Sequence, residues 1–241
     1  MKKKLLLGLI SLLTFCCQVQ AQQFKLLVCS KTNGFRHKSI PAAKEALTTL
    51  AKDNNWDITF TEDSLSFSDY HYLKHFDAVI FSMVTGKIFD SIQEKSFEKY
   101  IEKGGGLLTL HTGTDCEQHC DWYMKTIGAK FKAHPKQQQA RFVVVDSTHP
   151  ATKLLPKEWM AFDELYNFTA PVSTDEYTLI EVDETSYTGG TMNGKHPLVW
   201  CRQVKKGRIF QSAMGHTDDF YKDPRMLQFI KGAILWVARK G

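Results

Sequence analysis

The sequence predicts an α/β fold, in which a mostly parallel β-sheet is flanked by helices and carries a mixed or antiparallel C-terminal extension. Short apolar runs with little alternation are typical of strands buried on both faces. In the first half of the chain these runs alternate with helix-like segments, which is the pattern of parallel strands joined by right-handed crossovers. In the second half, strand-like runs follow one another with few helices between them, and this change predicts the extension.

The first half contains two clear helices among its strands. One spans Pro41–Ala51, where alanine and leucine recur at helical spacing. The other begins after Asp90, which we predict as an N-cap with Gln93 as its capping-box partner. Three glycines end that helix and lead into the fourth strand. The predicted strands are Phe24–Cys29, Trp56–Thr61, Phe76–Phe81 and Leu107–Leu110.

The second half closes with a helix that we expect to begin after Asp223, with Pro224 in its first turn. Its apolar stripe, which includes Leu227, Ile230 and Ile234, should pack in the core. The strands predicted before this helix are Arg141–Val145, Tyr177–Glu181, Leu198–Arg202 and Arg208–Ser212.

The N-terminus has the form of a secretory signal peptide, which we predict for residues 1–21. Three lysines precede the apolar run Leu5–Phe15, and cleavage is expected after Ala21. The run is too short to span a membrane. Lipidation at Cys16 or Cys17 is a less favoured alternative, because a lipobox has a small residue before its cysteine. We therefore expect export to a periplasm or the extracellular space, and one domain over residues 22–241.

Net charge bears on the kind of partner expected, and the cysteines bear on disulfide and metal binding. Of the net charge of +5, three units belong to the lysines of the signal peptide, and no basic cluster is interleaved with aromatics. Nucleic acid is therefore not an expected partner. In an oxidising compartment, a local disulfide between Cys116 and Cys120 is favoured, with two free thiols as the next alternative. A zinc site of Cys116, His119 and Cys120 is less favoured because a fourth ligand at matching spacing is missing.

His111 is the most informative candidate for chemistry. It directly follows the apolar strand Leu107–Leu110, and ligands of open α/β sheets bind outside the carboxyl ends of the strands. We expect His111 at the rim of the strand, where truncation of its side chain mainly removes a functional group. Asp115, four residues on across a turn, could orient its ring and raise its basicity.

Further candidates lie in loops and at strand ends. Arg36 and His37 stand between the first strand and the first helix, whose N-terminus attracts anions and polar oxygens. Pro135 biases His134 toward an extended backbone. Glu164 and Tyr166 alternate as in a strand, so both could face one pocket. The remaining histidines are His196 before Pro197, His216 just past the strand Arg208–Ser212, and His149, which we expect at the surface.

Taken together, these motifs resemble the trehalose-utilisation (ThuA-like) family. The matching segments extend over nearly all of the chain after residue 21 and keep one order. They read SKTNGFRH, GGGLLTLHTGTD, Gly128–Pro135, DELYNF, TSYTGGTMNGKHPLVWC and GRIFQSAMGH.

The resemblance implies a flavodoxin-like, class I glutamine amidotransferase-like α/β fold and a link to sugar metabolism, without a settled reaction. Glutamine amidotransferases carry a nucleophilic cysteine at the elbow where this chain has His111, so a glutaminase is not expected. The CEQHC stretch also departs from the family pattern. The family's motif residues correspond to Arg36, His37, His111, Asp115, His134, Glu164, Tyr166, His196 and His216.

Three functions stay open at this point. The leading hypothesis is an enzyme with acid/base chemistry on a sugar or an oxidised sugar derivative, as a hydrolase, lyase or isomerase. His111, Glu164, Asp115, His134 and His216 would be catalytic, and Arg36, His37, Tyr166 and His196 would bind the sugar. The alternatives are a metal-dependent hydrolase, with His111, His134, His216 and Glu164 holding a divalent ion such as zinc, and a non-catalytic sugar-binding module.

Overall fold

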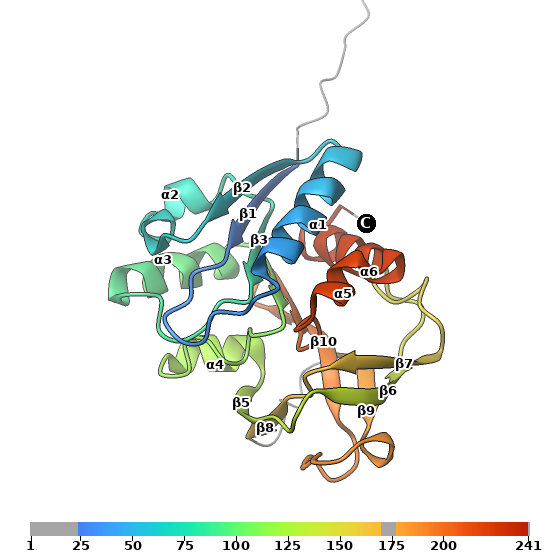
Figure 1. Ribbon diagram of the computed structural model, residues 1–241. Coiled ribbons are helices and arrows are strands. Elements are labelled where there is room, and N and C mark those ends of the chain that lie inside the picture. Colours follow the sequence, from blue (N-terminus) through green and yellow to red (C-terminus); the bar gives the residue numbers. More distant parts are fainter. Residues whose placement is uncertain (1–23, 170–176, 241) are drawn as a thin grey trace, which may run out of the picture.

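The computed structural model describes residues 24–169 and 177–240 (Figure 1). The expected signal peptide, residues 1–21, lies outside these described residues. Within them, none of the helices has the length and apolar character needed to cross a bilayer.

A nine-stranded mixed sheet forms the centre of the fold, in the order β2-β1-β3-β4-β11-β10-β9-β6-β7. The first five strands in this order are parallel, and each of the last four pairs antiparallel with its neighbour. The α/β prediction with an antiparallel extension is therefore confirmed. The strands are β1 (Lys25–Cys29), β2 (Asp57–Thr61), β3 (Ala78–Ser82), β4 (Gly106–Leu110), β6 (Gln138–Val144), β7 (Glu158–Asp163), β9 (Tyr177–Asp183), β10 (Pro197–Val204) and β11 (Gly207–Ser212).

Helices cover both faces of the parallel part, as Figure 1 shows. Helices α1, α5 and α6 contact one another on one face, and α3 and α4 lie on the other. A small two-stranded sheet of β5 (Lys130–Ala133) and β8 (Asn167–Thr169) stands apart. The helices are α1 (Ile40–Asp53), α2 (Tyr70–Leu73), α3 (Ser91–Glu102), α4 (Asp121–Ile127), α5 (Asp218–Lys222) and α6 (Pro224–Val237), with short 3₁₀ turns at Ser64–Phe67 and Glu184–Ser186.

The central strands are apolar at nearly every position because both of their faces are buried. Along β4, Leu107 joins the cluster beneath α3, whereas Leu108 joins the cluster beneath α1 and α6. Successive side chains of a strand point to opposite faces, so a continuous apolar run supplies two cores. The capping box of Asp90 and Gln93 that begins α3 is present as predicted.

Two sequence-based expectations are wrong. Cys116 and Cys120 are free thiols. Cys116 is fully buried, its Sγ lies 3.1 Å from the Tyr123 hydroxyl, and burial raises the pKa of this thiol. His149 is buried rather than at the surface, because its ring packs against Phe210 and Trp236.

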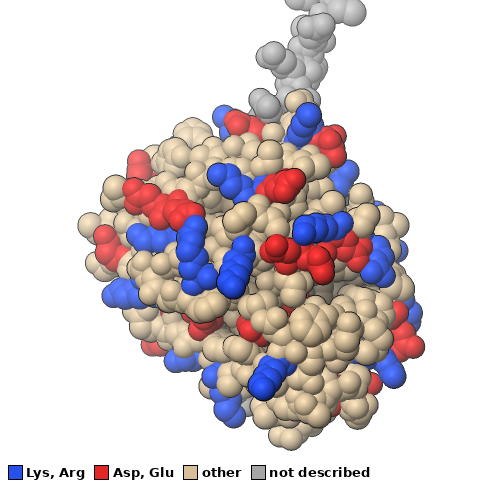
Figure 2. All heavy atoms as spheres, in the orientation of Figure 1, with Lys and Arg blue, Asp and Glu red and all other residues tan. Residues whose placement is uncertain are grey.

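The surface carries charges of both signs. On the face drawn in Figure 2, lysine and arginine side chains are interspersed with aspartate and glutamate. Such mixing keeps the local field weak, so this face offers no extended surface of a single sign.

Candidate active site

A cavity of about 760 Å³ opens at the carboxyl edge of the parallel strands. Most of the titratable residues selected from the sequence lie in its wall. Its lining consists of Phe35, His37, Lys38, Ser39, Asp115, Phe131, His134, Gln137, Glu164, Tyr166, His216, Thr217 and Asp218. Ligand pockets commonly have this size and combine apolar walls with a few polar groups.

The sheet topology brings four titratable side chains together. His37 follows β1, His111 follows β4 and His216 follows β11, so the three histidines share the carboxyl edge of parallel strands. Glu164 follows β7, at the far end of the sheet order. Four antiparallel pairings separate β7 from β11, so β7 runs in the same direction as β11 and its carboxyl end lies at the same edge.

His111 occupies a tight elbow at the end of β4. Its backbone has φ +68°, a left-handed conformation that residues with a side chain rarely adopt. Its backbone N–H donates to Ser212 O, and the ring Nδ1 lies 3.0 Å from Ala213 O. His111 directly follows the end of β4, as expected, but its side chain is 0% exposed. His111 lies at the floor of the site, beneath the cavity.

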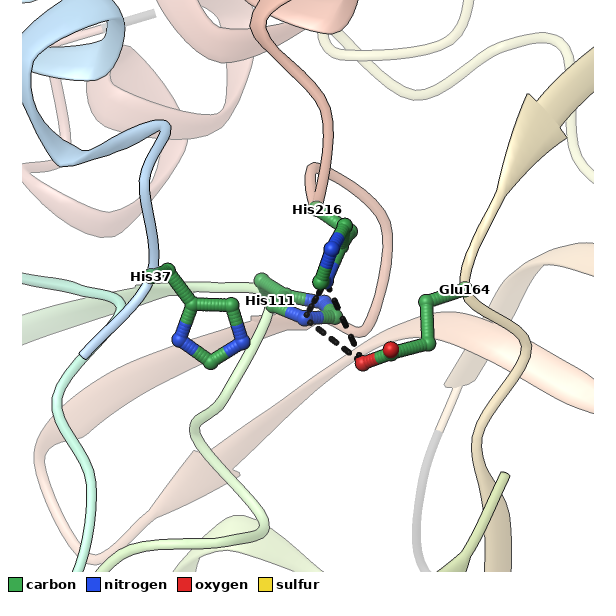
Figure 3. A group of neighbouring side chains, drawn as sticks. All are labelled: His37, His111, Glu164 and His216. Atoms are coloured by element: carbon green, nitrogen blue, oxygen red, sulfur yellow. Dashed lines mark hydrogen bonds and ion pairs between the residues drawn. The ribbon is translucent and has the colours of Figure 1, made fainter. Parts of the chain in front are cut away.

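His111, His216 and Glu164 form a compact triangle, shown in Figure 3. His111 Nε2 lies 3.2 Å from His216 Nδ1 and 3.3 Å from Glu164 Oε2. His216 Nδ1 lies 3.2 Å from the same Glu164 oxygen. The ring of His37 stands beside them, at 4.7 Å from the His111 ring centroid, and presents one nitrogen toward the group (Figure 3).

Burial and proximity shift the protonation of these groups. Burial lowers the pKa of His37 to about 3, and the neighbouring His111 and His216 add to the effect. Burial alone would raise the pKa of Glu164, but the ring nitrogens of His111 and His216 beside its carboxylate outweigh this effect and hold that pKa well below its usual range. The site therefore keeps a neutral His37 beside an ionised Glu164.

Asp115, His134 and Tyr166 complete the titratable wall of the cavity. Burial raises the pKa of Asp115 to about 6. A general acid or base is most effective when its pKa lies near the working pH, so this shift brings Asp115 closer to a catalytic role at neutral pH. The His134 side chain is 39% exposed, and its Nδ1 lies 3.4 Å from Glu164 Oε1. The Tyr166 ring lies between those of His111 and Phe131.

Two residues selected from the sequence lie away from this group. Arg36 extends to solvent and forms a bidentate ion pair with Glu62 at 2.8 and 2.9 Å. His196 is fully buried, with its Nε2 2.7 Å from Tyr166 O and its Nδ1 2.9 Å from Glu184 Oε1. His196 thus supports the backbone behind Tyr166, and neither residue lines the cavity.

Sequence reasoning missed Asp163 and Gln137. The buried carboxylate of Asp163 accepts backbone N–H groups from Glu164, Gly215 and His216 at 2.9 to 3.0 Å. Burial raises the pKa of Asp163, while His111 and the three N–H donors act in the opposite direction. The Gln137 amide lies 2.7 Å from His216 Nε2. In the sequence, the only sign of a role for Asp163 was its position next to Glu164. The contacts of Asp163 and of Gln137 with the segment around His216 join distant parts of the chain, so local patterns could not predict them.

The elbow before His216 depends on a glycine. Gly215 has φ +112°, and a Cβ at this position would lie 2.8 Å from the Tyr221 hydroxyl. That hydroxyl donates to Gly215 O at 3.0 Å. A side chain would therefore meet both backbone strain and a steric clash, and the turn that directs His216 into the site requires glycine.

Two groups of described residues have a geometry that could hold a metal ion. In the first, His37, His111, Glu164 and His216 each offer a ligand atom within 4.8 Å of the others. The second comprises Glu94, Glu117 and His119. The sequence-based ligand set contained His134 in place of His37, and the alternative with Cys116 and Cys120 is not among the clusters.

The fold and site together define an α/β protein in which a histidine occupies the elbow after a central parallel strand. Within this class the chain belongs to the ThuA family: the family model described as trehalose utilisation matches residues 25–237. No curated protein matches the sequence.

Solved structures agree with this assignment. A ThuA-like protein from Bacteroides uniformis is similar with a TM-score of 0.74 and 25% identity, covering 90% of this chain and 93% of its own. A ThuA-like protein from Parabacteroides merdae has a TM-score of 0.71, 19% identity and 90% coverage of each chain. A GMP synthase protein from Thermoplasma acidophilum shares the fold at a TM-score of 0.55 and 13% identity, over 91% of this chain and 96% of its own.

Proposed function

We propose that the protein is an enzyme that uses acid/base chemistry on a sugar or an oxidised sugar derivative. The observation that carries the proposal is the convergence of Asp115, His134, Glu164 and His216 on one cavity. Several proton donors and acceptors around a space of ligand size are the mark of proton-transfer catalysis. The family description, trehalose utilisation, supports a carbohydrate as the substrate class.

The walls of the cavity suit a sugar. Phe35 and Phe131 offer apolar surface to the C–H face of a pyranose, and polar groups of Lys38, Gln137 and Asp218 can bind hydroxyl groups. A non-catalytic sugar-binding module would have no use for a floor of buried titratable groups, since these are costly to bury. The site therefore favours an enzyme over a binding module.

The test pairs calorimetric binding with turnover, on a panel of disaccharides and their keto derivatives. Conversion of at least one sugar that also binds supports the proposal. If folded protein binds sugars but converts none of them, with or without added divalent metal, the protein is a binding module. If it binds none, the assignment of a carbohydrate substrate is wrong.

We further propose that the chain is exported, because residues 1–21 have the form of a cleaved signal peptide. Expression in a bacterium followed by N-terminal sequencing of the periplasmic protein tests this. A mature chain beginning at Gln22 is the expected result. Uncleaved protein retained in the cytoplasm contradicts it.

A further inference from the structure

We propose that His111, His216 and Glu164, completed by His37, bind a divalent transition-metal ion such as zinc at the floor of the cavity. This deepens the proposed function by adding a metal to the same site. Metal binding itself can be measured without any sugar.

The spacing of the ligand atoms is the first argument. Zinc binds imidazole nitrogen and carboxylate oxygen at about 2.0–2.1 Å, so two ligand atoms of a tetrahedral site lie about 3.3 Å apart. The three edges of the triangle of His111 Nε2, His216 Nδ1 and Glu164 Oε2 measure 3.2, 3.3 and 3.2 Å. An ion above the centre of this triangle would reach all three atoms without movement of the backbone.

The tautomer of His111 is the second argument. The carbonyl of Ala213 can only accept, so Nδ1 of His111 carries the hydrogen and donates to it at 3.0 Å. In the neutral ring, the lone pair is then on Nε2, the atom that faces Glu164 and His216. A hydrogen bond from the second ring nitrogen to a carbonyl is the usual support of a metal-binding histidine.

His216 and Glu164 have comparable support. The Gln137 amide lies 2.7 Å from His216 Nε2, and its oxygen can accept a hydrogen there after rotation of the amide. Asp163 binds the backbone N–H groups of both His216 and Glu164. The two ligands are therefore positioned by one buried carboxylate, which reduces the freedom lost on binding an ion.

His37 is the third argument. Only 5% of the residue is exposed, and its Nδ1 has no hydrogen-bond partner among the described residues. Its ring presents one nitrogen to the triangle (Figure 3), within 4.8 Å of the other ligand atoms. The nitrogen that faces the triangle is Nε2, because Nδ1 lies on the opposite side of the ring (Figure 3). A small rotation of the side chain would bring Nε2 to a metal ion bound by the other three ligands.

The ligand set selects the class of ion. Three imidazoles and one carboxylate suit zinc and its first-row neighbours, whereas magnesium and calcium prefer oxygen ligands. His134 is the natural comparison, because it lines the same cavity. Its Nδ1 already donates to Pro135 O at 2.9 Å, and it is not part of the cluster.

The experiment titrates Co²⁺ into chelator-treated, folded protein, with visible absorption and calorimetry as readouts. We expect one equivalent of Co²⁺, a spectrum of nitrogen and oxygen ligands in tetrahedral geometry, and displacement by Zn²⁺. Glu164→Gln and His216→Ala should each weaken binding by at least about 100-fold, since loss of an outer-shell partner alone typically costs about 10–100-fold. His75→Ala, which removes an exposed histidine that is not part of the cluster, is the control and should bind like wild type.

Circular dichroism and thermal melts establish that each variant is folded, and the wild-type stoichiometry tests the site even if a variant is not. Folded wild type that binds no Co²⁺ or Zn²⁺ overturns the proposal, as does unchanged binding in both Glu164→Gln and His216→Ala. Metal binding with no turnover of any sugar leaves the metal site intact and refutes the enzyme. Turnover of a sugar by folded protein that binds no metal supports the enzyme and overturns the metal site.

Discussion

The Asp163 carboxylate accepts the backbone N–H of His216 at 3.0 Å, although 53 positions separate the two residues in the chain. The same carboxylate accepts the N–H of Glu164, the residue that pairs with the His216 ring. One buried side chain thus holds the end of β7 against the end of β11. The geometry of the site depends on this connection, although Asp163 does not belong to the His–Glu cluster.

We predict that Asp163→Asn destabilises the protein by about 2 kcal/mol, because an amide offers one acceptor where three N–H groups now find two carboxylate oxygens. Urea denaturation measures the free energy of unfolding. Asp146→Asn is the control, since Asp146 accepts from Thr148 in an exposed turn and should cost less than about 1 kcal/mol. Equal decreases of the unfolding free energy in the two variants would show that the buried Asp163 carboxylate contributes no more than an exposed turn aspartate.

A second prediction concerns the backbone of His111. Both His111→Ala and His111→Gly lose a buried ring, but only glycine adopts φ +68° without strain. His111→Gly should therefore be the more stable of the two by about 1 kcal/mol. The comparison is made by urea denaturation in the presence of chelator, which removes any contribution of a metal.

Leu110 provides the matched pair for this test. It precedes His111 in β4, where the backbone is extended, so Leu110→Gly should be less stable than Leu110→Ala. The glycine variant should thus be the more stable one at position 111 and the alanine variant the more stable one at position 110. The same order at both would show that the elbow is not strained.

Asp115 should be essential for turnover. It lines the cavity, and burial raises its pKa to about 6. We predict that Asp115→Asn lowers kcat for a converted sugar by about 10²–10⁴-fold, the usual contribution of a general acid or base. Sugar binding, measured by calorimetry, should change little.

Asp218→Asn is the control for Asp115, because Asp218 also lines the cavity but is less buried, at its edge. A loss of kcat in this variant as large as that of Asp115→Asn would indicate a general effect of charge. Proton transfer by Asp115 would then not be supported.

The buried His149 should make the free energy of unfolding depend on pH. Burial lowers the pKa of His149 from 6.5 to about 4, and its Nδ1 accepts the N–H of Ala151, which requires the neutral ring. The unfolded chain then binds the proton first, so stability is complete above pH 6.5 and falls as the pH decreases toward 4. The free energy of unfolding should decrease by about 3 kcal/mol once the pH is below both pKa values.

The variant His149→Asn keeps an acceptor for Ala151 but cannot be protonated. Its free energy of unfolding should be lower at pH 7, because ring packing is lost, and should fall less between pH 6.5 and 4. His75→Asn, at an exposed position, should leave the pH slope unchanged. A wild-type slope in His149→Asn would show that other groups cause the acid sensitivity.

The fold could be predicted from the sequence because its signals are local. Apolar runs such as Leu107–Leu110, the capping box of Asp90 and Gln93, and helical spacing each depend on residues close in the chain. The ends of β1, β4 and β11 were recognisable for the same reason. His37, His111 and His216 could therefore be selected without coordinates.

Only the tertiary structure decided which of these residues meet. Glu164 reaches His111 and His216 because four antiparallel pairings return β7 to the direction of β11, and strand order is not encoded by local spacing. The pairing of Arg36 with Glu62, the burial of His149 and the bond from His216 to Asp163 likewise depend on long-range packing. The sequence by itself determined the parallel strands, the main helices and the candidate side chains, but not β7, the strand that leads to Glu164. The order and direction of the strands decided which of those side chains form one site.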